Sequence, residues 1–399
     1  MTEPVIQLPT AGESTFETYD RIRERGEVVP IQLPGDVPAW IAVSHRAVSA
    51  VLDDRMFSKS AANCPALHDG TIPADWPMRA LTDIDHMLNK DGLEHRRLRK
   101  TISRAFTAAR VAALEPRIEK IATELIDNFP GGNEVELVSA FTTPFPVRVI
   151  CELFGVPVSE QPHIKTWSTT IVSHTSTGEQ AQTAMQSMIA YFIELLERKK
   201  REPGDDLTTG LLQADTDNEL TTEDLVNMLW LVIVAGHETT VHLLSNAVVV
   251  LCAHPDQRAK ALAEDRWGDV VEEILRYQSS VVGALMRYAR HDVTVAGVDI
   301  PAGSMMLWYG GVGRDARHYP EADRFDIDHD HRDQLAFGRG PHVCLGAPLA
   351  RLESRIALSE LFNRFPRLSL ACDPSTIQYA PQISTNGPLE LPVLLDSLG

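Results

Sequence analysis

Apolar residues recur every three or four positions through most of the chain between residues 92 and 277, which is the spacing of amphipathic helices. The clearest example follows Glu115-Pro116, a dipeptide that favours the first turn of a helix. Its apolar positions are Ile118, Ile121, Ala122, Leu125 and Ile126. The pattern therefore predicts a helical portion over about residues 92–277 and one further helix over about residues 346–365.

One predicted helix is long and apolar on nearly every side. It starts at Thr221, where Asp224 follows three residues later in the arrangement of a capping box, and it runs to about Ala253, just before His254-Pro255. At 1.5 Å per residue such a helix is roughly 45–50 Å long. A helix that is apolar all round belongs in the interior, so we expect it to be central and buried.

Strand-like patterns occupy three shorter portions, near residues 25–60, 280–330 and 370–399. Residues 36–43 read as a strand after a Pro/Gly turn, and residues 293–303 have the pattern of a hairpin with a proline at its edge. The sequence contains no internal repeat or interdomain linker. We therefore expect a mainly α chain with a smaller β region, an α+β fold that forms one domain over residues 1–399.

The chain carries 37 Lys and Arg against 55 Asp and Glu, a formal net charge of −18. This balance argues against nucleic acid or an anionic membrane as a partner, because binding to either requires a positively charged surface. The longest apolar run, residues 228–236, is far shorter than the roughly 20 residues of a membrane span. The first residues lack the layout of a signal peptide, and five scattered cysteines form no disulfide or zinc pattern, so we expect a cytoplasmic protein.

The segment richest in chemistry is a ten-residue loop that contains one cysteine. Its glycines and proline predict a tight turn, and Cys344 stands just before the predicted helix over residues 346–365, where free N–H groups stabilise a thiolate. Gly346 removes a side chain where a flat group could approach. The alternative is a turn with an incidental buried cysteine. The segment reads Phe337-Gly338-Arg339-Gly340-Pro341-His342-Val343-Cys344-Leu345-Gly346.

A second segment places polar residues in the middle of the long apolar helix, where they are costly unless they are paired. Thr239 can donate a hydrogen bond back to the carbonyl of Ala235, and Gly236 allows the backbone to open or a ligand to come close. Glu238 adds a carboxylic acid beside the hydroxyl. The alternative is a kinked core helix whose polar residues are satisfied within the protein.

Both segments resemble the cytochrome P-450 superfamily: the first resembles its haem-binding loop, and the second its oxygen-binding helix segment. The resemblance implies the cytochrome P-450 fold, with haem b between the long central helix and the helix after the cysteine loop. It implies that Cys344 is the axial ligand of the iron and that Glu238 and Thr239 deliver protons for dioxygen activation. The other expected haem contacts in these segments are Phe337, Gly338, Gly346 and Ala235.

The resemblance also assigns charged residues elsewhere in the chain. Glu273 and Arg276 resemble the family's Glu-x-x-Arg motif, and Arg324 resembles its third member, so we expect a buried structural network that holds the cysteine loop. The two propionate carboxylates of a buried haem must be paired with cations. The expected propionate ligands are His95, Arg99, Arg287 and His342.

By the same resemblance, the substrate pocket is lined almost entirely by apolar residues, which predicts a hydrophobic small organic substrate. Part of this lining can equally be ordinary core. The run Asp328-His329-Asp330-His331 looks like a metal site, but it lacks the usual ligand spacing, and we interpret it as a solvated loop. The expected substrate contacts are Met87, Leu88, Ala235, Val281, Val282, Leu285 and Ile383.

The resemblance implies a haem-thiolate monooxygenase that inserts one oxygen atom of dioxygen by hydroxylation or epoxidation, in secondary metabolism or in steroid or polyketide oxidation. No segment resembles a flavin or nicotinamide domain, so we expect electrons from a separate ferredoxin, with a ferredoxin reductase and NAD(P)H. Arg97, Lys100 and Arg339 should help to dock this acidic donor. Peroxide-driven or oxidative-coupling chemistry at the same haem is the alternative, and a non-catalytic haem sensor is a third interpretation.

Overall fold

The chain divides into two compact units in the computed structural model. We call them the strand unit, formed by residues 1–94, 272–344 and 378–387, and the helical unit, formed by residues 95–271, 345–377 and 388–399. The expectation of a single domain stays a prediction. The structure describes residues 6–7, 15–53, 55–76, 78–79, 82, 85–172, 176–215, 220–283, 286–379 and 384–395.

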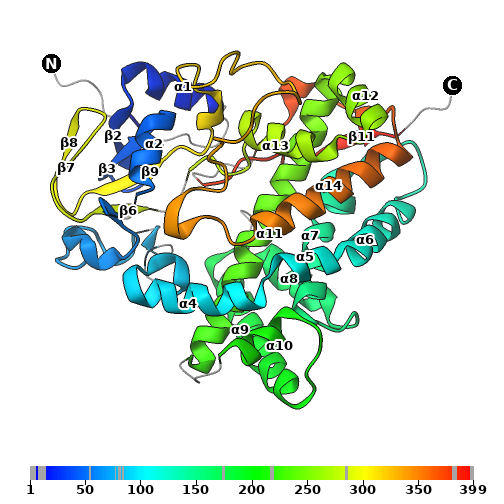
Figure 1. Ribbon diagram of the computed structural model, residues 1–399, viewed down its shortest axis with the longest axis horizontal. Helices are drawn as coiled ribbons and strands as arrows, with labels where there is room; N and C mark the ends of the chain where they lie inside the picture. The colour runs from blue at the N-terminus through cyan, green and yellow to red at the C-terminus, as the bar shows by residue number, and fades with distance from the viewer. Residues whose placement is uncertain are drawn as a thin grey trace. The chain divides into compact units, whose positions relative to one another are not determined.

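A six-stranded sheet is the framework of the strand unit, in the order β1-β2-β3-β9-β6-β4 (Figure 1). β2 and β3 pair antiparallel, β3 runs parallel to β9, and β6 pairs antiparallel with both β9 and β4. The predicted strand over residues 36–43 is confirmed as β3. The strands are β1 (Ile6–Gln7), β2 (Val28–Leu33), β3 (Val37–Ala42), β4 (Phe57–Ser58), β6 (Arg287–Ala289) and β9 (Met305–Trp308).

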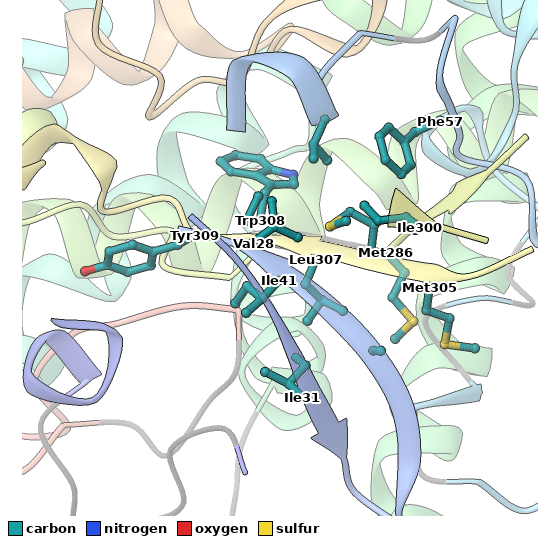
Figure 2. Close-up of a cluster of buried hydrophobic side chains, with 14 of the residues drawn as sticks. Val28, Ile31, Ile41, Phe57, Met286, Ile300, Met305, Leu307, Trp308 and Tyr309 are labelled. Carbon is teal, nitrogen blue, oxygen red and sulfur yellow. The ribbon is translucent and has the colours of Figure 1, made fainter. Parts of the chain in front are cut away.

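The core of the strand unit consists of apolar side chains from this sheet and the segments beside it. Figure 2 shows part of it, where Ile41 of β3 and Leu307 of β9 are register partners and both are buried. Each fully buried side chain of this size contributes about 1.5–3 kcal/mol. The predicted hairpin is confirmed as β7 (Val293–Val295) and β8 (Val298–Ile300). Helices α1 (Thr15–Arg25) and α2 (His45–Val51) also belong to this unit.

The helical unit is organised around α11 (Thr222–Ala253), the long helix predicted from the sequence. Both hydrogen bonds of its capping box, between Thr221 and Asp224, are present. The helix is long and apolar enough to cross a membrane, but 67% of its apolar window is buried in the protein, as in a core helix. It packs against α7, α8, α9 and α14, and Figure 1 shows α14 (orange) beside α11 (green).

The remaining helices of the helical unit pack on α11 or on the helices beside it. A small sheet in the order β10-β11-β5 belongs to the same unit. The predicted helix over residues 346–365 is confirmed as α14. The helices are α5 (Ala108–Ala113), α6 (Glu115–Asp127), α7 (Pro144–Phe154), α8 (Gln161–Val172), α9 (Gly178–Arg201), α10 (Leu207–Ala214), α12 (Pro255–Glu264) and α14 (Ala347–Arg364); α4 (Gly92–Ala105) and α13 (Trp267–Tyr277) each have residues in both units. The strands are β5 (Glu134–Glu136), β10 (Ser369–Leu370) and β11 (Pro392–Leu394).

Candidate functional site

Residues 337–344 of the cysteine loop belong to the strand unit, and backbone hydrogen bonds close this part of the loop. The N–H of Cys344 donates to the carbonyl of Phe337 at 2.8 Å, and the N–H of Gly338 donates to the carbonyl of Leu335 at 2.8 Å. Gly338 and Gly340 have φ values of 70° and 76°, a conformation that strongly favours glycine. Cys344 is exposed, which argues against an incidental buried cysteine. The loop therefore presents a thiol from a defined backbone position.

The predicted acid and alcohol lie on an open face of α11. In the middle of this largely buried helix Ala235 is exposed, and Glu238 and Thr239, three and four residues later, are half-buried. The Thr239 hydroxyl donates to the Ala235 carbonyl at 2.6 Å, as predicted. Gly236 has a different role from the one expected, because a Cβ there would come within 3.1 Å of Ile150. This glycine allows α7 and α11 to pack closely.

Two polar residues on the buried side of α11 connect it to neighbouring helices, and neither was predicted from the sequence. His237 Nδ1 and Ser168 Oγ of α8 are hydrogen-bonded at 2.6 Å, and burial lowers the pKa of His237 to about 4, so the ring is neutral at pH 7. The hydroxyl of Thr240 donates to Glu353 Oε1 of α14 at 3.0 Å. Burial raises the pKa of Glu353 to about 8. The sequence feature that could have indicated this contact is a glutamate among the buried positions of α14.

Because Glu353 is buried as a neutral acid, we expect it to make the protein less stable as the pH rises. Its folded-state pKa of about 8 exceeds the ordinary value of 4.5, so its contribution is complete below pH 4.5 and is lost as the pH rises through 8. One pKa unit corresponds to about 1.4 kcal/mol, which gives a total loss of about 3–5 kcal/mol. Glu353→Gln should remove this decline in the free energy of unfolding, measured by denaturant titration at several pH values. Glu360→Gln on the same helix should retain it, and a decline that persists without Glu353 would contradict the assignment.

A second polar network, in the strand unit, is centred on the buried carboxylate of Glu273. Arg276 donates to both of its oxygens at 2.7 Å, from Nε to Oε2 and from Nη2 to Oε1. The same guanidinium donates to the carbonyls of Gly313, Ala322 and Arg324 at 2.7–2.8 Å. Burial opposes ionisation of Glu273, but the hydrogen bonds from Arg276 and other donors lower its pKa to about 2. This pair ties the end of α13 to the segment that leads into the cysteine loop.

The third member of this network differs from the prediction. The side chain of Arg324 is 55% exposed and pairs with Glu321 at 3.2 Å and Asp326 at 2.8 Å. Within the network, the Arg324 carbonyl accepts from Arg276, and the Asp326 N–H donates to Glu273. His329 Nδ1 and His331 Nε2 instead lie 2.9 and 3.0 Å from the two oxygens of Glu273. The interpretation of this run as a solvated loop was wrong for both histidines, because the loop folds back onto a buried carboxylate.

The four predicted propionate ligands fall into two groups. Arg287, on β6, is 2% exposed, and His342 lies in the cysteine loop, so both belong to the strand unit. His95 and Arg99 are one turn apart on α4 in the helical unit, where His95 is buried and Arg99 is half-buried. The structure adds a residue that was not predicted, Lys59, to the buried basic side chains of the strand unit.

The predicted substrate contacts are described only in part. Met87 is buried and Leu88 is half-buried in a short 3-10 turn, η3 (Met87–Asn89). Val281 is half-buried, whereas Val282 is fully buried in the hydrophobic core of the strand unit, as in the ordinary-core alternative. Two further predicted contacts lie outside the described residues, Leu285 and Ile383.

The strand unit has the chemistry that haem b requires, an iron ligand and cations for the propionates. The exposed thiol of Cys344 can supply a thiolate. The buried basic side chains of Lys59, Arg287 and His342 are close enough to repel one another when charged. Buried like charges are stabilised by an anion placed among them. The donor set therefore fits an iron-containing group that carries carboxylates.

Comparison with known proteins agrees with this chemistry. The cytochrome P450 family matches residues 170–266 and 268–385 of the chain. The chain is 39% identical to the vitamin D(3) 25-hydroxylase of Pseudonocardia autotrophica, over 97% of this chain and 95% of that protein. It is 36% identical to the mycinamicin IV hydroxylase/epoxidase of Micromonospora griseorubida, over 94% of each chain. Among solved structures, CYP154C4 from a Streptomyces species has a TM-score of 0.92 at 36% identity, covering 99% of this chain and 100% of that one.

The fold and the site thus define a haem-thiolate enzyme. The chain belongs to the cytochrome P450 family and is a monooxygenase of that family. Members bind haem b through a cysteine thiolate, so haem b is the cofactor of this protein. The predicted α+β cytochrome P-450 fold is confirmed.

Proposed function

We propose that this P450 hydroxylates or epoxidises a hydrophobic small molecule, with Cys344 as the thiolate ligand of the haem iron. The observation that carries the assignment is the exposed thiol of Cys344. The backbone N–H of the same residue closes the loop by donating to the Phe337 carbonyl. Cys64 and Cys151 are buried, and burial raises the pKa of Cys151 to about 12, which disfavours a thiolate there. When haem is bound, the thiolate supplies electron density that favours cleavage of the O–O bond.

Glu238 and Thr239 manage the protons of the reaction in this proposal. The Thr239 hydroxyl directs its own proton to the Ala235 carbonyl, so its oxygen presents lone pairs to the open face of α11. A water or a protonated group on that face can therefore donate to it. Glu238, half-buried beside it, can take a proton from solvent and release it toward the same face.

Oxygen labelling tests the reaction class. With ¹⁸O₂, NAD(P)H, ferredoxin reductase and ferredoxin, we expect one ¹⁸O atom in the product and the other in water. Glu238 and Thr239 on the open face of α11 support dioxygen, rather than peroxide, as the oxidant. A product labelled only from ¹⁸O-hydrogen peroxide, or a coupled product without added oxygen, would contradict the proposal and support the peroxide-driven or coupling alternative. A haem spectrum that shifts with ligands while no reductant is consumed would indicate a sensor.

The substrate in this proposal is a hydrophobic small organic molecule, such as a steroid or a polyketide from secondary metabolism. Two relatives are named as a vitamin D(3) 25-hydroxylase and a mycinamicin IV hydroxylase/epoxidase. Of the expected contacts that the structure describes, Leu88, Ala235 and Val281 have exposed apolar surface, whereas Met87 and Val282 are buried. A binding screen should therefore favour polycyclic and macrocyclic compounds over small polar ones.

We also propose that a ferredoxin with its reductase supplies the electrons, in the cytoplasm. Lys100, on α4, and Arg339, in the cysteine loop, are exposed and can face an acidic partner. Arg97 is less suited than expected, because it lies 3.6 Å from Asp224 and is partly neutralised. Attraction between exposed charges is screened by salt.

Electron transfer from an acidic ferredoxin should slow as the ionic strength rises. At low salt, Lys100→Glu and Arg339→Glu should each slow reduction by about threefold or more, because charges at the edge of an interface act mainly on association. Lys120→Glu, an exposed change on α6, is the matched control and should have little effect. The measurement is the stopped-flow rate of haem reduction by ferredoxin under carbon monoxide. A reduction rate that does not change with salt in the wild type or in any variant would refute ferredoxin docking at these residues.

A further inference from the structure

A lysine with a buried side chain lies beside the predicted propionate ligand Arg287. Lys59 is 5% exposed and directly follows β4, which pairs antiparallel with β6. Because Ser58 pairs with Tyr288, the register places Lys59 opposite Arg287. Lys59 Nζ donates to the carbonyl of Met286 at 3.2 Å, and Met286 belongs to the apolar core drawn in Figure 2. The amine is therefore held inside the strand unit.

Asp91 organises the basic residues around this lysine. Its carboxylate accepts the backbone N–H of Lys59 at 3.0 Å and pairs with Arg290 at 3.1 Å and with His342 at 3.5 Å. Burial acts in the opposite direction, but hydrogen bonds from His342 and Ser58 hold the pKa of Asp91 well below its ordinary value. The ionised carboxylate of Asp91 thus contacts several basic groups at once.

A charged lysine is costly to bury in these surroundings, and an anion placed beside it lowers that cost. Burial, and after it the charge of Arg287, lowers the pKa of Lys59 well below its ordinary value, while Asp91 acts the other way. Among the described residues, two histidines also lie near Lys59: His86 is buried, and His342 pairs with Asp91. A carboxylate supplied by a ligand would relieve this repulsion.

We propose that Lys59 is a further propionate-binding residue, which contacts a haem propionate together with Arg287 and His342. The proposal rests on the proposed placement of a propionate at those two residues. Asp91 is the positioning carboxylate, because it fixes the backbone of Lys59 and the ring of His342. A cation beside a propionate also favours the reduced haem, since reduction adds one negative charge. Lys59 should therefore influence both haem retention and reduction potential.

The test uses the holoenzyme and the variant Lys59→Gln, which keeps a donor for the Met286 carbonyl but removes the charge. We expect haem transfer to apomyoglobin to become about tenfold faster, the usual effect of losing one charged hydrogen bond. The ferric/ferrous reduction potential, from spectroelectrochemical titration, should become more negative. Lys120→Gln, which removes an exposed lysine charge, should change neither quantity. If Lys59→Gln does not accumulate as holoenzyme, the same two quantities are measured for Lys59→Met.

The outcomes separate this inference from the propionate placement on which it rests. If the Lys59 variants change neither quantity while Arg287→Gln changes both, Lys59 is not a propionate ligand and the placement stands. If Arg287→Gln also changes neither, the placement itself fails. Faster haem transfer with an unchanged reduction potential would show that Lys59 only stabilises the fold, and it would overturn the proposal.

Discussion

Replacement of Glu273 by glutamine is expected to lower the free energy of unfolding by about 3–5 kcal/mol. Glutamine keeps the shape of the side chain but not its charge, so Arg276 would remain as an uncompensated charge in a buried position. His329 and His331 would lose the same carboxylate, which both contact within 3.0 Å. The measurement is a denaturant titration of wild type and variant, followed by far-UV circular dichroism and by Soret absorption.

The control for this prediction is Glu321→Gln, which breaks the exposed pair with Arg324. Exposed ion pairs contribute about 0–1 kcal/mol, so this variant should remain close to wild type. The pH dependence gives a second check. The pKa of Glu273 is lowered to about 2, so its stabilising effect is present above its ordinary pKa of 4.5 and is lost as the pH falls through 2. A Glu273→Gln protein as stable as Glu321→Gln would contradict the account.

The second large effect is expected on the α11 pair. Thr239→Val preserves the shape of the side chain but removes the hydroxyl that donates to Ala235. We expect product formation to fall about 100-fold while reductant consumption continues, because a positioned group in the path of a proton contributes roughly 10²–10⁴-fold. Glu238→Gln should slow turnover to a similar degree. The measurement is product formed per NAD(P)H consumed with saturating ferredoxin.

Thr240→Val is the matched control for Thr239→Val. This neighbouring hydroxyl faces the buried side of α11 and donates to Glu353 instead. Its loss should reduce stability by about 1–2 kcal/mol and leave the ratio of product to reductant unchanged. Equal losses of coupling in the two threonine variants would mean that the open face of α11 has no special role.

The parts of the structure that could be predicted from the sequence depend on local information. α11 begins after Thr221 because the capping box and the apolar pattern lie within a few residues of each other, and it ends before His254-Pro255. The hydrogen bond from the Thr239 hydroxyl to the Ala235 carbonyl also depends only on helical spacing. The tight cysteine loop follows from glycines at the positions where the backbone needs positive φ.

The parts that could not be predicted depend on contacts between residues far apart in the chain. Glu273 and His329 are separated by 56 positions, and a run of Asp and His looks solvated until the fold brings it to a buried carboxylate. Thr240 and Glu353 are separated by 113 positions and meet only because α11 packs on α14. Lys59 becomes a site residue only through the pairing of β4 with β6.

The most direct test of the account is the absorption spectrum of the dithionite-reduced protein under carbon monoxide, measured for wild type and for Cys344→Ser. A thiolate ligand predicts a strongly red-shifted Soret band in the wild type. The serine variant should lose this band and show a Soret maximum at shorter wavelength. A wild-type protein without the red-shifted band, or a Cys344→Ser protein that keeps it, would contradict Cys344 as the iron ligand.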